Sequence, residues 1–321
     1  MEQEQLNRAL CVATSFGRAA AVKRLIKDGA EVKAKEGYPL KSASRLKTPG
    51  SSEVITLLLD NSHFEKEELS QALYLSTVAN SGENCALLLE RFPYLVNGPQ
   101  SSNSFSRAIE TGKNNIVRLF IDKGHDIKFH ESFPRPPLEI AISSNNADAC
   151  GVLLSSGADL SQNNWRLLKN ACALSDIEVV SALLKSNIDI NMEEGVLLKN
   201  AIQGRRYDTA KLLVDNGADV NLGTALQLTV TLDDIRYTKL LVENGANASF
   251  DNSILLVDAF SAGEFETFDY LVKNGADESV LMNKELDFVF SIPETPTDTG
   301  IKQRTSDEND PDCRQAIPFK V

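Results

Sequence analysis

The segment LEIAISSNNADACGVLLSSGAD, residues 138–159, decides the fold because it holds two short apolar stripes separated by a polar turn. Leu138, Ala141 and Ile142 lie at the spacing i, i+3, i+4, which places them on one face of a helix. A second stripe with the same spacing begins at Cys150 and predicts a second helix. The segment therefore predicts a helix–turn–helix unit.

The same unit recurs along the chain in one register. A small residue of the first stripe and a glycine or asparagine after the second are sixteen residues apart in each copy. Glycine suits this place because a left-handed residue ends the second helix there, and we expect Asn187 to take that conformation in its own copy. The pairs are Ala13 with Gly29, Ala108 with Gly124, Ala141 with Gly157, Ala171 with Asn187, Ala201 with Gly217, Thr229 with Gly245, and Ala259 with Gly275.

Neither helix of a unit can bury its apolar stripe alone, so the units must stack against one another. The repeat therefore predicts an all-α solenoid of helix–turn–helix units joined by short connections. Between Gly29 and Gly124 the chain has room for two further, degenerate units, at residues 38–61 and 73–97.

The repeat resembles the ankyrin repeats, a family whose unit ends its second helix in Gly-Ala-Asp. DIEVVSALL (176–184) and LLVDNGADVN (212–221) are similar to that family's second helix and turn, and the resemblance covers residues 4–290. The family's Thr-Pro-Leu-His start survives here only as Pro136-Pro137-Leu138 and Thr224-Ala225-Leu226, without its histidine. Asn191 and Asn221 fit the family's turn-stabilising asparagine, with hydroxylation as the alternative interpretation.

The expected organisation is an ankyrin-type solenoid over residues 1–292, followed by a tail. The solenoid is predicted to contain about nine repeats and a C-terminal half-repeat, because Leu286 and Val289 restart the first-helix spacing before Pro293 halts it. Residues 293–321 are rich in Pro, Thr, Asp and Gly without an apolar period, which predicts a disordered tail.

Composition narrows the function classes. The chain has 33 basic and 45 acidic residues, a net charge of −12, which argues against duplex DNA or an anionic membrane as the main partner. The excess is local: residues 1–172 carry +1, residues 173–292 carry −11 and residues 293–321 carry −2. Without a long apolar run or a secretory start, we expect a soluble, cytoplasmic protein that is monomeric alone.

No motif for catalysis or for a cofactor is recognisable. The three histidines, His63, His125 and His130, are far apart, and the five cysteines are scattered without a C-x-x-C pair. Cys150 and Cys172 occupy positions that are apolar in sister units, so we interpret them as small core residues. We therefore expect no enzyme, no bound metal and no cofactor.

The resemblance implies that the chain binds another protein through a concave surface of first helices and projecting connections, or fingers. The finger from Asp126 to Leu138 is the longest, and its aromatic and charged residues lie where no core period requires them. Such residues exposed together are typical of interface anchors, although packing against a neighbouring finger is the alternative. The predicted partner-binding residues are Phe129, His130, Phe133 and Arg135 on this finger, Trp165 and Arg166 one repeat later, Glu193 and Glu194, and Phe250 on another finger.

The leading hypothesis is thus a non-enzymatic adaptor or scaffold. The alternative is an inhibitor whose acidic repeats, residues 173–292, mask a basic surface of a partner protein, including the case of a surface that binds nucleic acid. The chain itself is expected to make no direct contact with nucleic acid. The charge asymmetry favours this alternative, and Glu193 and Glu194 belong to both hypotheses.

Overall fold

The structure is a computed structural model that describes residues 2–128, 135–161, 165–249 and 252–279. Within those ranges every regular element is a helix, which confirms the predicted all-α fold class. The chain divides into two compact units, Met1–Ala276 and Asp277–Val321, and all the helices of the described residues belong to the first. The predicted solenoid end at residue 292 and the tail lie outside the described residues and stay predictions.

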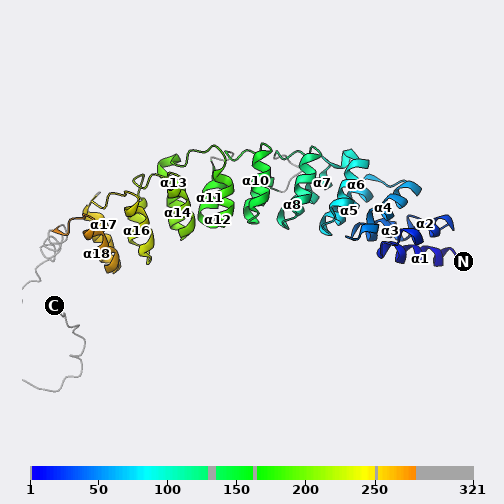
Figure 1. Cartoon of the computed structure of the whole chain (residues 1–321), viewed down its shortest axis with the longest axis horizontal. Coiled ribbons are helices and arrows are strands. Elements are labelled where there is room, and N and C mark those ends of the chain that lie inside the picture. The colour runs from blue at the N-terminus through cyan, green and yellow to red at the C-terminus, as the bar shows by residue number, and fades with distance from the viewer. Residues whose placement is uncertain (1, 129–134, 162–164, 250–251, 280–321) are drawn as a thin grey trace, which may run out of the picture. The chain divides into compact units, whose positions relative to one another are not determined.

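The described helices follow one another as pairs in chain order (Figure 1). The first helices are α1 (Gln3–Ser15), α3 (Ala34–Ser44), α5 (Lys66–Val78), α7 (Pro99–Glu110), α9 (Pro137–Ser143), α11 (Arg166–Leu174), α13 (Met192–Gln203), α15 (Ala225–Val230) and α17 (Asn252–Ala262). The second helices are α2 (Ala19–Lys27), α4 (Pro49–Asn61), α6 (Gly82–Arg91), α8 (Asn114–Asp122), α10 (Ala147–Ser155), α12 (Ile177–Leu184), α14 (Tyr207–Asp215), α16 (Ile235–Glu243) and α18 (Phe265–Lys273). A short 3₁₀ turn, η1 (Pro93–Leu95), follows α6.

The helices form two layers. Each first helix packs against the first helix of the next pair, and each second helix packs against the next second helix. One apolar core runs between the layers through Met1–Ala276. The predicted register is confirmed at its centre, because Ala141, Ala171 and Ala201 are fully buried.

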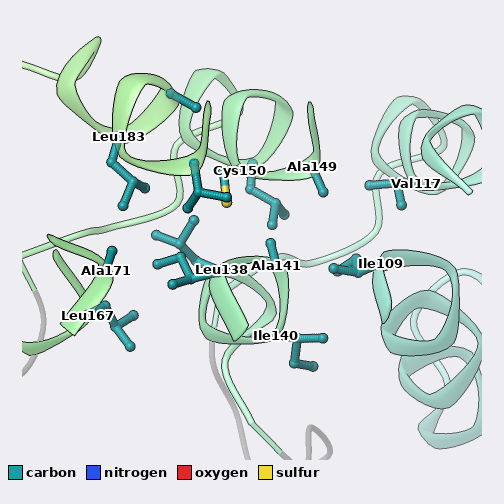
Figure 2. Close-up of a cluster of buried hydrophobic side chains, with 14 of the residues drawn as sticks. Ile109, Val117, Leu138, Ile140, Ala141, Ala149, Cys150, Leu167, Ala171 and Leu183 are labelled. Atoms are coloured by element: carbon teal, nitrogen blue, oxygen red, sulfur yellow. The ribbon is translucent and has the colours of Figure 1, made fainter. Parts of the chain in front are cut away.

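The core between α9, α10, α11 and α12 shows how one unit depends on the next (Figure 2). Leu138 and Ala141 of α9 point toward Cys150 of α10, and Leu183 of α12 closes the cluster from the following unit. Each of these side chains is at most 4% exposed. The apolar stripe of a unit is therefore completed by its neighbour, as stacking requires.

Second helices end in a repeated hydrogen-bonded turn. In the fifth pair, Gly157 has a left-handed φ of 93° and the N–H of Ala158 donates to the carbonyl of Leu153 at 2.9 Å. The same bond recurs from Ala218 to Leu213 at 3.0 Å and is the hallmark of a glycine-ended helix. No other heavy atom crowds Gly157, so it is the backbone conformation that favours glycine there.

The expectation for Asn187 is wrong. Asn187 does not have a positive φ; α12 ends earlier, at Leu184, and the N–H of Ile188 donates to the carbonyl of Ser186 at 2.9 Å. A side chain in the left-handed conformation costs about 1–2 kcal/mol, and ending the helix early avoids that cost. This unit therefore closes with a tighter turn than its sisters.

Asparagines tie successive turns together. The side-chain oxygen of Asn191 accepts from the N–H of Asp219 at 2.7 Å, and its amide donates to the carbonyl of Gly217 at 3.3 Å. Asn221 repeats both bonds one unit later, to Asn247 at 2.9 Å and to Gly245 at 3.1 Å. The turn-stabilising interpretation of Asn191 and Asn221 is therefore confirmed, because each bridges its own turn to the next.

Stability should depend on the buried leucine of each second helix. Replacing Leu183, which is fully buried, with Ala should lower the free energy of unfolding by ~2–5 kcal/mol, because the neighbouring units cannot collapse into the space. The matched control on the same helix is Glu178→Ala, an exposed change expected to stay within about 0.5 kcal/mol. Denaturant titration measures the free energy of unfolding of both variants. Equal losses in the two variants would contradict the predicted helix register.

The buried thiols should be inert in the folded protein. Burial raises the pKa of the Cys85, Cys150 and Cys172 thiols from 9.0 to about 12. Because the folded pKa values are the higher ones, the stability contributed by these neutral thiols is complete below pH 9 and is lost as the pH rises toward 12. In a Cys313→Ser variant, a thiol reagent at pH 8 should label the remaining cysteines only at the rate of unfolding; rapid labelling in native buffer would contradict the burial.

Candidate functional site

The first helices present one face away from the second helices. In α7, Phe105 and Ala108 are buried, whereas Asn103, Arg107 and Glu110 are exposed. The same outward positions recur in each first helix because the helical period and the stacking register are shared. We call these outward side chains, together with the residues that directly precede each first helix, the first-helix face.

A polar hollow of about 370 Å³ lies on this face between α5 and α7. Tyr74 of α5 keeps 37% of its surface exposed at the rim. Ser106 is 5% exposed, and its hydroxyl has no hydrogen-bond partner among the described residues. The hollow is lined by Tyr74, Gln100, Asn103, Ser106, Arg107 and Glu110. Its lining offers a ligand hydroxyl groups, two side-chain amides, a guanidinium and a carboxylate.

A second hollow of about 320 Å³ lies on the same face between α9 and α11. Leu174 at the end of α11 is 67% exposed, which is unusual for leucine, and it lines the hollow beside Ile142. Glu139, Asn170 and Arg166 add polar groups. This hollow therefore combines an apolar wall with a guanidinium.

Side-chain contacts connect the two hollows. Glu110 of the first hollow approaches Arg135 at 3.9 Å, and the Nη1 of Arg135 donates to the Oγ of Ser143 in the second hollow at 3.3 Å. Arg166 then pairs with Glu139 at 3.5 Å across α9 and α11. The predicted residues Arg135 and Arg166 thus lie on one continuous surface with both hollows.

Trp165 occupies a position that is glycine in sister units. It lies six residues before the small residue of its first helix, as do Gly37, Gly195 and Gly223. All four have left-handed φ angles, 59° at Trp165. A bulky side chain in this conformation is strained, and such strain persists only where its surroundings enforce it. The indole is half-buried and packs against the core, so Trp165 has a structural role beside any role in binding.

Glu193 and Glu194 lie in a left-handed turn that precedes the regular part of α13. Their φ angles are 45° and 55°, and the same geometry occurs at Lys35 and Glu36 before the regular part of α3. The carboxylate of Glu193 pairs with the Nζ of Lys169 on α11 at 2.5 Å. Glu193 therefore links two neighbouring first helices, whereas Glu194 is exposed.

The remaining predicted residues, Phe129, His130, Phe133 and Phe250, lie outside the described residues. Sequence reasoning missed Tyr74, Ser106 and Leu174, which line the hollows. The signal was present in the repeat register, because Tyr74 and Ser106 both lie two residues before the small position of their helices.

No cluster of three metal-ligating side chains occurs in the part of the chain that the structure describes. Nor is any helix within the described ranges long and apolar enough to cross a membrane. Burial raises the pKa of the Cys172 thiol to about 12. Cys150 and Cys172 are buried as predicted, and neither lines the two hollows.

Residues 105–194 match the family described as ankyrin repeats, in three copies. The match over this stretch confirms the resemblance to ankyrin repeats and the predicted class of solenoid. No curated protein matches the chain.

Three solved structures illustrate what the chain is similar to. The ankyrin repeat domain of Bcl-3, titled a unique member of the IkappaB protein family, is 22% identical over 55% of this chain and 87% of its own, with a TM-score of 0.46. An ankyrin repeat domain from Acinetobacter baumannii AYE is 21% identical over 54% of this chain and 98% of its own, with a TM-score of 0.47. The human ASB11 ankyrin repeat domain is 18% identical over 84% of this chain and 98% of its own, with a TM-score of 0.32.

The backbone strain at Trp165 predicts that a glycine variant at this position is more stable than an alanine variant, the reverse of the usual order. Trp165→Gly removes the indole but suits the left-handed φ, whereas Trp165→Ala removes the indole and keeps the strain. We expect the Gly variant to be the more stable by about 1 kcal/mol, although glycine usually costs stability relative to alanine. Thermal or denaturant unfolding of both variants tests this, and a more stable Ala variant would show that Trp165 is not held left-handed.

Proposed function

We propose that this chain is a non-enzymatic interaction module that binds a segment of a partner protein along the first-helix face between α5 and α11. Ankyrin repeats generally mediate protein–protein interaction. The observation that carries the proposal is that two hollows of about 370 and 320 Å³ lie on one face and are joined by the contacts of Arg135 with Glu110 and Ser143. A segment laid across the first helices would reach both.

The exposed residues suit such a contact. Tyr74 and Leu174 offer apolar surface, and Arg107 and Arg166 offer guanidinium groups near the same two hollows. Aromatic residues and arginine supply most of the binding energy in protein interfaces. We propose the finger residues Phe129, His130 and Phe133, together with Trp165, as further partner contacts, and Phe250 as a separate contact.

The alternative of an acidic inhibitor would use a different surface. The described acidic residues of 173–292 lie mostly on the second helices and in the turns, with Glu178, Asp208 and Glu266 as examples. Neither hollow is lined by Glu193 or Glu194. The hollows therefore favour the interaction module over the inhibitor.

We further propose that the chain acts as a monomer in the cytoplasm. The described cysteines, Cys11, Cys85, Cys150 and Cys172, are free and buried, which suits a reducing compartment.

Peptide selection tests the binding face directly. A library of random peptides displayed on phage is panned against the immobilised full chain, and the affinity of the selected peptides is measured by fluorescence anisotropy. Leu174→Asp should weaken binding by about tenfold or more, because it places a charge on the apolar wall of the second hollow. Leu174 is 67% exposed, so the thermal melt should change little.

Phe265→Asp is the matched control. Phe265 is 60% exposed but belongs to α18, a second helix, so its replacement should leave peptide affinity unchanged. Peptides that lose affinity with Phe265→Asp and keep it with Leu174→Asp would reject the first-helix face as the binding surface.

A further inference from the structure

We infer that the first-helix face binds an acidic segment, one whose carboxylates are received by arginine and lysine side chains of α3 to α13. The inference rests on the proposed function and specifies its partner. It runs against the net charge of the chain, which is −12, because the two layers of helices carry different charges.

Cations outnumber anions on this face. Within the described residues from α3 to α13, the outward positions hold two carboxylates, Glu110 and Glu139. The left-handed turn at the start of α13 adds Glu193 and Glu194, and in the same turn of α3 Glu36 follows Lys35, so that their charges cancel. Glu67 and Glu68 lie in the first turn of α5 on the finger side, where Glu68 pairs with Lys33 at 2.8 Å. The cations of the face are Lys41, Arg45, Arg107, Arg135, Arg166, Lys169 and Lys199.

These cations keep most of their binding capacity. Arg107 and Arg135 share Glu110 at 3.5 and 3.9 Å, which are long distances for ion pairs, and each guanidinium has five N–H donors. Lys41, Arg45 and Lys199 form no ion pair with any described residue. Lys169 is the exception, because Glu193 holds it. An incoming carboxylate would therefore meet donors that the protein does not use itself.

The polar hollow between α5 and α7 gives a second, independent indication. The hydroxyl of Ser106 is buried there without a described partner, and an unsatisfied buried hydroxyl costs free energy until a ligand pairs with it. Arg107 and Asn103 line the same hollow, so one carboxylate could accept from the Ser106 hydroxyl, the Asn103 amide and the Arg107 guanidinium. The ring of Tyr74 at the rim provides apolar contact beside it.

The local charge can dominate over the net charge. Charges in physiological salt are screened over about 8 Å, so a ligand seated on the first helices interacts mainly with the side chains that line them. The acidic groups of the second helices lie on the other layer, where they favour solubility and repel acidic ligands from that side.

The selected peptides provide the test. The net charge of peptides retained by the wild-type full chain is compared with that of the unselected library, and an excess of Asp and Glu is expected. Affinities are then measured for the triple variant Arg107→Gln, Arg135→Gln, Arg166→Gln. Its affinity for the acidic peptides should fall about tenfold, the combined effect of three exposed charge pairs.

The matched control removes the same charge from the second helices, with Lys23→Gln, Arg118→Gln and Lys211→Gln. All three residues are exposed, and the control should bind the peptides as the wild type does. An equal loss in both triple variants would overturn the inference, because only net charge would then matter. Thermal melts of both establish that each variant is folded.

Two further outcomes separate this inference from the proposed function. Retained peptides that depend on Leu174 but carry no acidic excess would overturn the acidic partner and leave the interaction module standing. Retained peptides that are insensitive to Leu174→Asp would overturn both. A labelled single-stranded RNA that binds the wild type as tightly as the acidic peptides, and loses affinity in the arginine variant, would assign the face to phosphates and reject the acidic segment.

Discussion

Ala108, Ala141, Ala171 and Ala201 are fully buried on the first helices, and Ala141 points toward Cys150 of α10, so their small size sets how closely the packed helices approach. A larger side chain would push neighbouring units apart, and each unit would then expose part of the stripe that its neighbour now covers. In the third and eighth pairs this position is polar, with Ser76 and Thr229 buried there. Thr229 is buried there and receives a hydrogen bond from Thr238 at 3.0 Å. Spacing, burial and the alignment of the outward residues all follow from this close packing.

The turns hold the first helices in register from the other end. Asn191 and Asn221 each satisfy polar backbone groups in the following unit, so the connections are not independent loops. This constraint explains how unfavourable conformations persist at Glu193 and Glu194. Each lies between a fixed turn and a packed helix, and the surrounding bonds offset the local cost. These residues are consequently well placed to present side chains at a defined position on the first-helix face.

Charge is divided between the two layers. Arg107 and Arg166 line the hollows on the first helices, whereas most described acidic residues of the C-terminal units lie on the second helices and turns. Both sets are solvated, so neither determines the fold, and the division is free to serve recognition. A partner therefore meets a different electrostatic surface on each layer of a protein whose net charge is negative.

The repeat register, the all-α class and the buried positions were determined by the sequence alone, because the 3.6-residue period and the sixteen-residue spacing are local properties that recur in several copies. The same register also specifies the positions of Tyr74 and Ser106 on the first helices. Asn187 was predicted incorrectly, since residue tolerance does not decide whether a helix ends early. Only the tertiary structure showed that Arg135 reaches both Glu110 and Ser143, that Glu193 pairs with Lys169, and that Ser106 is buried without a described partner. These relationships join residues on different helices, and their geometry depends on how closely the units stack, which no local pattern of residues specifies.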